Sequence, residues 1–279
     1  MKKNLTVILL LFAFSLVKAQ NELGVYAFPQ TTTLMNKANR QGDPIYQPEL
    51  TYTYGGGVTF NHDFKKQPYG MLRGGNSARS MKKKLGLKFG VFYSAHDQKF
   101  SSRYRIKADS LAFHEGRKRF DYLKFPVNLR LTIPTTNEHF NFALYGGPQI
   151  SYLMRAQGGI VYWEDRGDHD YYDLPFSDVG YFKRLTLDAV AGADVEYKFK
   201  RGSIGKFEFH RWVHLVMGVR GDWSVSTVEN KDAIINNYPT YGNIDNYVEE
   251  RTGSRNGTLS LLFGFTYLFH VADYHRTRY

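Results

Sequence analysis

The chain has 279 residues, a formal net charge of +11, 21 Tyr, 21 Phe, 26 Gly and no Cys. The lack of Cys excludes disulfides, thiolate metal sites, cysteine nucleophiles and a lipid anchor on cysteine. The many aromatic residues and glycines favour an all-β protein, and the length fits one large barrel or two small domains. A basic total would indicate nucleic acid only if the charge gathered on one surface, and no DNA or RNA motif is present.

The first twenty residues, MKKNLTVILLLFAFSLVKAQ, carry two lysines, an apolar run from Leu5 to Val17, and small residues around Ala19. This pattern predicts a secretory signal peptide over residues 1–19, cleaved after Ala19, which leaves 20–279 as one exported domain. A membrane anchor is the rival interpretation, but such a run spans only about 20 Å of a ~30 Å hydrocarbon core. No later stretch is long and apolar enough for a transmembrane helix, so strands would have to span any membrane.

Eight segments alternate apolar and polar residues with period two, the pattern of strands with one apolar and one polar face. In chain order they are Glu22–Leu34, which is the weakest, Leu50–His62, Leu85–His96, Tyr122–Pro134, Phe140–Arg155, Arg184–Phe199, Val213–Ser226 and Gly257–Val271. Strands of soluble proteins usually have about 5 to 6 residues, whereas a tilted membrane-crossing strand needs about 9 to 11. The length of these segments therefore favours a membrane barrel.

The connections between these segments also alternate in length. The first, third, fifth and seventh are long: Met35–Glu49, Gln98–Lys118, Ala156–Gly180 and Thr227–Asn256. Pro134–His139 is short, Lys200–Trp212 is moderate, and Phe64–Lys84 is longer than the scheme requires. Long outer loops and shorter inner turns predict a single eight-stranded antiparallel up-and-down transmembrane β-barrel with both termini in the periplasm.

The polar faces decide which way this barrel is turned. They collect Lys88, Lys124, Arg130, Arg155, Arg184, Asp188, Asp194, Glu196, Lys198, Arg220 and Asp222. In a soluble lipocalin-type barrel the apolar faces would have to fit inside, yet eight strands leave room only for side chains or one small ligand. In the inverse arrangement lipid meets the apolar wall and the charges pair inside. A Lys or Arg on the lipid side would cost ~2–4 kcal/mol at the midplane, so we predict that the apolar face points outward.

Glycines and aromatic residues support the same arrangement. Eight glycines share the polar face, where a crowded lumen needs small neighbours, or else they mark bulges: Gly55, Gly57, Gly86, Gly90, Gly147, Gly192, Gly218 and Gly264. Aromatic residues near strand ends predict girdles at the two membrane interfaces. They are Tyr52, Phe64, Tyr122, Phe140, Tyr152, Tyr181, Phe199, Trp212, Trp223, Tyr267 and Phe269.

Four sequence features carry a family resemblance. They are the signal peptide ending KAQ and the segments YLKFPVNLRL, ALYGGPQISYLM and LSLLFGFTYLF. Together they resemble the eight-stranded outer-membrane β-barrel proteins of Bacteroidota, which include PorT-like proteins. The resemblance implies the fold and an outer-membrane location, and for the PorT-like members a role in a secretion system. Pro126 matches a proline of that group, and we expect a bulge or a missing ladder bond there.

Two loops carry clustered charge. Phe64–Lys84 has seven basic residues and no acid, which suits anionic headgroups, an acidic partner or a plain solvated turn. Glu164–Asp173, EDRGDHDYYD, is the best candidate site. Its carboxylates could hold Ca²⁺, although the spacing is not that of an EF-hand, and Asp168-His169-Asp170 could serve a protease that activates water. A solvated acidic loop is the default interpretation.

The histidines do not predict a hydrolase. His62, His96, His139 and His210 fall at strand ends or turns, His214 and His270 face the lumen, and His114, His169 and His275 lie in loops or the tail. None has an evident Ser and acid partner on the lipid face. We therefore predict a non-enzymatic barrel with a structural or accessory role in the envelope and no catalytic, cofactor or metal residues. Its expected partners are outer-membrane lipids, lipopolysaccharide and an envelope protein, but not nucleic acid. A barrel enzyme acting on lipid A or peptides, a narrow pore and a soluble binder are the alternatives.

Overall fold

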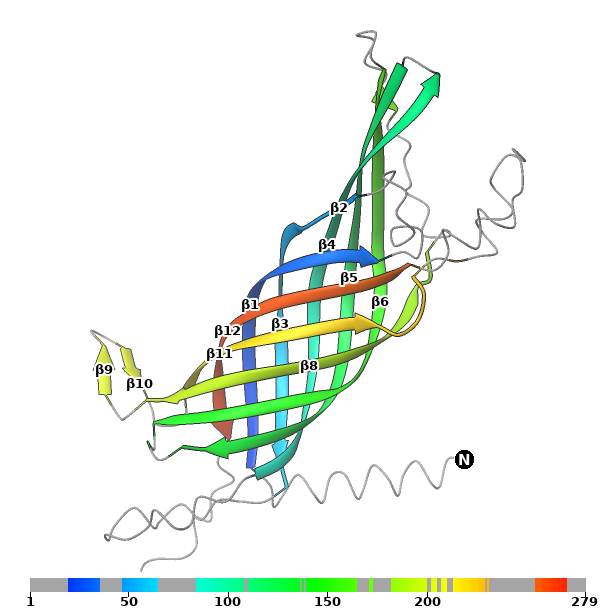
Figure 1. Cartoon of the computed structure of the whole chain (residues 1–279). Coiled ribbons are helices and arrows are strands. Elements are labelled where there is room, and N and C mark those ends of the chain that lie inside the picture. The colour runs from blue at the N-terminus through cyan, green and yellow to red at the C-terminus, as the bar shows by residue number, and fades with distance from the viewer. Residues whose placement is uncertain are drawn as a thin grey trace, which may run out of the picture.

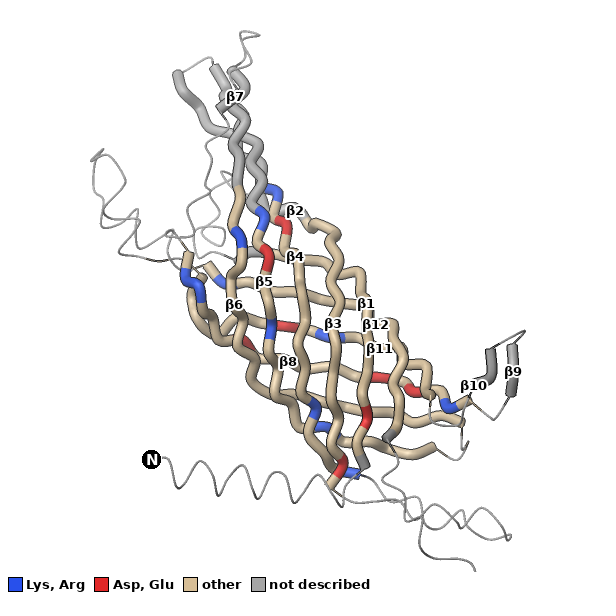
Figure 2. Tube along the Cα trace, turned by 180° about the vertical axis from the view of Figure 1, so that it is seen from behind, with Lys and Arg blue, Asp and Glu red and all other residues tan. Residues whose placement is uncertain are grey.

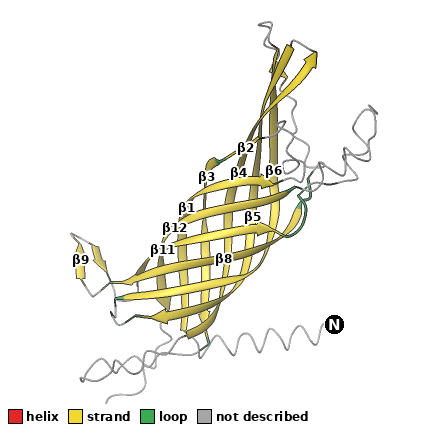
Figure 3. Cartoon of the chain, viewed as in Figure 1, coloured by secondary structure: helices red, strands yellow, loops and turns green. Residues whose placement is uncertain are grey.

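A computed structural model describes residues 20–35, 47–64, 84–107, 110–135, 137, 139–164, 171–172, 182–199, 202–204, 207–209, 213–228, 230 and 254–269. Within these ranges every regular element is a β-strand (Figures 1 and 3). No helix in this part of the chain has the length and hydrophobicity needed to cross a membrane. The predicted signal peptide and its cleavage after Ala19 lie outside the described residues.

Eight antiparallel strands close into a barrel. They are β1 (Gln20–Met35), β3 (Thr51–Asp63), β4 (Lys84–Lys107), β5 (Ser110–Pro134), β6 (Phe140–Glu164), β8 (Leu185–Lys198), β11 (Val213–Ser224) and β12 (Arg255–Phe269). Each strand pairs with the next one in this series, and β12 pairs back with β1, which closes the ring. All eight predicted strands and the up-and-down topology are confirmed. Because Asn21 lies opposite Phe269, the first strand begins and the last strand ends at the same end of the barrel.

Four short strands accompany the barrel. β2 (Gln47–Glu49) pairs with β4, and β7 (Tyr171–Tyr172) pairs with β6. β9 (Gly202–Ile204) and β10 (Phe207–Phe209) form a separate hairpin in the connection between β8 and β11.

Three strands are much longer than the sequence pattern predicted. β4, β5 and β6 have 24, 25 and 25 residues and extend beyond the other strands at one end of the barrel (Figure 1). The prediction of a long loop at Gln98–Lys118 is therefore wrong, since the β4–β5 ladder continues to the pair Lys107 and Ser110. The predicted loop Ala156–Gly180 likewise begins as strand, up to Glu164. Outside a bilayer a strand needs no apolar face, so its composition resembles that of a loop.

The predicted inversion of the two faces is confirmed. Phe125, Leu129 and Leu261 point outward with 39%, 52% and 51% of their surface exposed, whereas Arg130 and Asp194 are 1% and 2% exposed. From Lys124 to Arg130 of β5 and from Thr258 to Leu268 of β12, buried and exposed side chains alternate residue by residue. A continuous apolar wall around a charged interior is stable when lipid covers the wall. A closed barrel is suited to lipid because its backbone groups pair between neighbouring strands.

Most of the predicted interface aromatics also lie on the outer wall. Tyr52, Phe64, Phe140, Tyr152, Trp223 and Tyr267 are exposed, and Phe199 is half-buried. Tyr122 is a correction, because it points into the lumen and is 1% exposed. Tyr181 and Trp212 lie outside the described residues, and the side chain of Phe269 is not among those described.

Two basic residues predicted in the lumen lie on the outside instead. Arg155 is exposed because the β5–β6 register shifts by one residue: Tyr122 lies opposite Leu153, but Asp121 lies opposite Arg155. Such a bulge reverses the alternation beyond it, and sequence periodicity does not reveal it. Arg184 is exposed because it precedes the first residue of β8, where the alternation begins.

The glycines on the lumen side make room for large side chains. A Cβ at Gly57 would lie 2.2 Å from the carbonyl oxygen of Val91 and 2.7 Å from the Cα of Phe92. At Gly55 a Cβ would meet the ring of Phe28, and others face rings in the same way. The register shifts in the described ladders fall at Arg105/Lys107 and Asp121/Tyr122, so the alternative that these glycines mark bulges is wrong.

Pro126 behaves as expected from its missing N–H. The β4–β5 ladder pairs Phe89 with Val127 and Phe92 with Lys124, and the pairs between them are absent. The register is the same on both sides of this gap, so the proline interrupts the ladder without producing a bulge.

Adding a methyl group at Gly57 tests the close packing of the lumen. We expect Gly57→Ala to destabilise the barrel by about 1–3 kcal/mol, because the Cβ would collide with the β4 backbone. Gly221→Ala is the matched control, since its Cβ would have no neighbour nearer than 3.9 Å. Urea unfolding in lipid vesicles, followed by tryptophan fluorescence, measures both. Equal losses would contradict this account of the glycines.

A charge on the outer wall tests the contact with lipid. Val127 is 46% exposed on the outward face of β5. We expect Val127→Arg to destabilise the barrel by about 2–4 kcal/mol. Leu50 directly precedes β3 at the end of the barrel from which β4–β6 project, and Leu50→Arg is expected to cost about 0–1 kcal/mol. The same unfolding assay in vesicles compares the two variants. A Val127→Arg protein as stable as the parent would rule out lipid at this position.

Candidate functional site in the barrel lumen

At the end of the lumen where β1 begins and β12 ends, one arginine contacts three carboxylates. Arg130 of β5 forms ion pairs with Glu22 of β1 at 3.1 Å, with Asp63 of β3 at 3.6 Å, and with Glu196 of β8. Asn61 donates to Glu22 at 3.1 Å, and all of these side chains are buried. One guanidinium thus connects β1, β3 and β8 to β5, as its several donors allow.

The middle of the lumen is a layer of aromatic rings around a second ion pair. Lys88 of β4 donates to Asp194 of β8 at 2.6 Å, and its ammonium lies 4.0 Å from the ring centroid of Tyr145 and 5.2 Å from that of Tyr26. Such cation–π contacts strengthen when they are removed from water. The whole layer is a buried cluster of Tyr26, Phe28, Phe92, Tyr145, Val190, Val216 and Leu262.

A third group of charges follows towards the end from which β4–β6 project. Asp222 accepts from Lys124 and from Arg220, both at 2.7 Å. The guanidinium carbon of Arg220 also lies 4.5 Å from the ring centroid of Phe92, so this group rests directly on the aromatic layer. Gln149 accepts from Arg220 and donates to Asp188 at 2.9 Å, which extends the network to β8.

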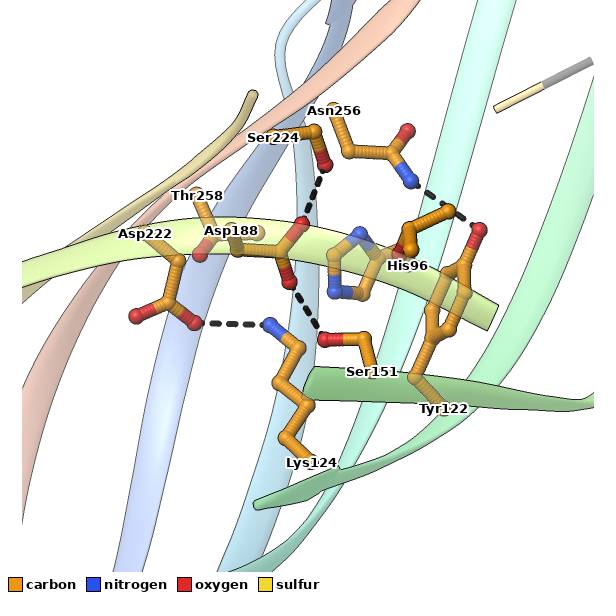
Figure 4. A pocket seen from close by; sticks show the side chains of 10 residues that line it. His96, Tyr122, Lys124, Ser151, Asp188, Asp222, Ser224, Asn256 and Thr258 are labelled. Carbon is orange, nitrogen blue, oxygen red and sulfur yellow. Dashed lines mark hydrogen bonds and ion pairs between the residues drawn. The ribbon is translucent and has the colours of Figure 1, made fainter. Parts of the chain in front are cut away.

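A small pocket lies within this third group (Figure 4). It is lined by His96, Tyr122, Lys124, Ser151, Thr186, Asp188, Asp222, Ser224, Asn256 and Thr258. Its cavity volume is about 10 Å³, which accommodates about one water molecule. Above it, a second buried apolar cluster covers the mouth of the lumen: Phe120, Tyr122, Leu153, Ala156, Phe182 and Val228.

The polar side chains around the pocket are engaged in hydrogen bonds with one another, which does not favour a catalytic role. Asp188 accepts from the hydroxyls of Ser151 and Ser224, the latter at 2.7 Å, and from the amide of Gln149. A nucleophilic serine needs an adjacent base to take its proton, and a histidine normally supplies it. The ring of His96 instead contacts the hydroxyl of Ser94 at 3.1 Å and packs against Tyr122. Ser151 and Ser224 therefore serve as hydrogen-bond donors to a buried carboxylate, and Ser94 donates to Gln30 at 3.0 Å.

The structure brings together most of the lumen charges that the sequence predicted. Lys88, Lys124, Arg130, Asp188, Asp194, Glu196, Arg220 and Asp222 are all buried inside the barrel, and Lys198 is half-buried at its end. His214 faces the lumen as predicted, whereas His270 lies outside the described residues. Glu22, Asp63 and the aromatic layer were missed. Tyr26 and Phe28 occupy the lumen positions of β1, which explains why the alternation of that segment was weak.

The acidic loop candidate stays a prediction. Of Glu164–Asp173, the structure describes only Glu164 at the end of β6 and the two residues of β7, so Asp168, His169 and Asp170 lie outside it. In the part of the chain that is described, no three His, Asp or Glu side chains converge as metal ligands. The basic link between Phe64 and Lys84 is also outside, apart from these two end residues.

The closed ring, the apolar wall and the charged lumen define the chain as a β-barrel of the kind found in outer membranes. Solved structures with a similar course include the outer membrane protein OprG from Pseudomonas aeruginosa, at 10% identity and a TM-score of 0.37, covering 91% of this chain and 98% of that one. Neisserial surface protein A (NspA) has 11% identity and a TM-score of 0.32, covering 88% of this chain and 97% of that one. The outer membrane protease OmpT from Escherichia coli has 11% identity and a TM-score of 0.31, covering 90% of this chain and 97% of that one. No family model and no curated protein matches the sequence. The membrane assignment rests on the barrel's own surface.

Breaking the central ion pair tests how the lumen is stabilised. Lys88→Met is expected to destabilise the barrel by about 3–5 kcal/mol, because it leaves the carboxylate of Asp194 buried without its cation. Adding Asp194→Asn to that variant is expected to restore most of the loss, since no buried charge then remains at the pair.

Lys183→Met, which removes an exposed lysine, is the control and is expected to change stability by less than about 0.5 kcal/mol. Unfolding of all the variants in vesicles gives the comparison. If the double variant were no more stable than Lys88→Met, the charge of Asp194 would not be the cause.

Proposed function

We propose that the chain is a non-enzymatic integral barrel of the outer membrane, exported by a signal peptide cleaved after Ala19, with a structural or accessory role in the envelope. The observation that carries this proposal is the filled lumen. Two charged groups and the aromatic layer between them occupy the barrel from one end to the other, and an apolar cluster covers the mouth. A barrel closed in this way transports nothing through its interior, so its function belongs to its outer wall and its loops.

The two rival functions make demands that the described residues do not support. A pore needs a continuous aqueous path, and the pocket in the lumen holds about one water molecule. An enzyme acting on lipid A or on peptides needs a nucleophile or an activated water next to a base. Ser151 and Ser224 are donors to Asp188, and Ser94, which contacts His96, donates to Gln30 at 3.0 Å.

The most specific accessory role that we propose is that of a PorT-like protein, which assists a secretion system. The strand segments around Pro126 and in β12 resemble the wider group of Bacteroidota outer-membrane barrels, and assistance to a secretion system is the role that its PorT-like members would imply. Affinity purification of the full chain from detergent-solubilised outer membrane, with partners identified by mass spectrometry, tests this form. A reproducible envelope complex would support it, and recovery of the barrel alone would favour a stand-alone structural role.

The closed lumen predicts a silent protein in planar lipid bilayers. We expect no single-channel steps above the lipid baseline, because buried side chains fill the cross-section. A Phe92→Ala, Tyr145→Ala variant removes two rings of the aromatic layer and is expected to admit water and give measurable steps. A difference in electrophoretic mobility between the unheated and the heated sample shows that each protein is folded. Regular steps from the parent protein would replace this proposal with the pore.

A further inference from the structure

Five basic side chains gather on the outer wall where β4, β5, β6 and β8 leave the apolar band. They are Lys99, Arg119, Arg155, Lys183 and Arg184. Four of them are exposed, and the side chain of Arg119 is 40% exposed. We call this group the basic rim. Figure 2 shows basic positions at this end of β5, β6 and β8, next to the projecting part of the long strands.

Strand pairing makes these residues neighbours across the wall. Arg119 lies opposite Asp97 on β4 and opposite Gln157 on β6, two residues from Arg155. On the other side of β6, the backbone N–H of Leu153 donates to the carbonyl oxygen of Arg184 at 2.7 Å. The basic rim is therefore continuous over four adjacent strands, although its members come from parts of the chain up to 85 residues apart.

Little acidic charge balances the basic rim. Asp121 accepts from Arg119 at 3.3 Å and from the hydroxyl of Tyr93 at 3.1 Å, and its side chain is 9% exposed. Asp97 and Asp188 are buried. Lys99, Arg155 and Arg184 have no acidic partner within the described part of the chain. Unneutralised cations this close together repel each other, and an anion that bridges them removes the repulsion.

The position of the basic rim indicates that a lipid headgroup is the anion it binds. Met154, directly before Arg155, and Leu185, directly after Arg184, are exposed apolar residues of the wall. The cations therefore begin where the apolar band ends, which is the level of lipid headgroups. Arginine binds phosphate through paired N–H donors and is suited to this contact. The opposite end of the wall differs, since Phe140 and Tyr197 form an aromatic contact there at 5.1 Å.

We propose that the basic rim binds the phosphate groups of lipid A in the outer leaflet, which fixes the depth and orientation of the barrel. This inference rests on the proposed outer-membrane function and names a partner for it. Arg155 and Arg184 supply the central contacts, Lys99 and Lys183 the flanking charge, and the apolar wall below them receives the acyl chains.

The test compares binding of bisphosphorylated lipid A, fully dephosphorylated lipid A and phosphatidylglycerol to the full-length mature barrel in detergent micelles by native mass spectrometry. We expect the parent to retain the bisphosphorylated form preferentially, and an Arg155→Gln, Arg184→Gln variant to lose about tenfold in its apparent affinity. A Lys84→Gln, Lys198→Gln variant removes the same charge at the opposite end of the barrel and is the matched control, expected to bind like the parent. Heat-dependent gel mobility shows that each variant is folded.

Three results would overturn the proposal. They are equal losses in the two double variants, equal retention of dephosphorylated lipid A, and equal retention of phosphatidylglycerol, which would make the site one for glycerophospholipids. Each of these failures occurs in a folded barrel. Failure of the outer-membrane function would appear differently, as a protein that does not insert into vesicles or fractionate with the outer membrane.

Discussion

Closing eight strands into a ring leaves a lumen wide enough for side chains and little else. With lipid outside and no bulk water inside, a charged group in the lumen is stabilised by partners that other strands supply. Arg130 does this by reaching Glu22, Asp63 and Glu196 at once, and Lys88 by lying between Asp194 and two tyrosine rings. The same narrowness explains the glycines, because a ring such as that of Phe28 fits only where the facing residue lacks a side chain.

The alternation of residues was enough to predict the strands and the direction of their faces. Period two is a local property, and exclusion of charge from lipid is strong enough to impose it on Phe125, Leu129 and Leu261 alike. What the alternation could not show was any change of phase. The extra residue at Met154 reverses the pattern, and Arg155 was assigned to the wrong face for that reason. The projecting parts of β4–β6 were missed because, beyond the bilayer, no solvent difference separates their two faces.

The partners within the lumen depend on register, which the sequence of one strand does not contain. Lys88 and Asp194 are 106 residues apart and meet only because six strands between and beside them take fixed positions around the ring. The sequence therefore predicted that charges of both signs lie inside, but not which cation meets which acid. The aromatic layer was hidden for a different reason: Tyr26 and Phe28 resemble wall residues in composition, and only their parity with Glu22 and Gln30 places them in the lumen.

The inside of the barrel differs in net charge from the rest of the molecule. Among the described residues buried in the lumen there are six acids and four basic residues other than histidine, although the whole chain has a net charge of +11. Some buried carboxylates therefore depend on neutral donors, as Asp188 does on two serines and a glutamine. The positive excess must lie on the wall, at the rims and in the connections. A neutral or basic lumen would have suggested the passage of anions. An acidic interior beneath a basic exterior instead directs any anionic partner to the outside of the barrel.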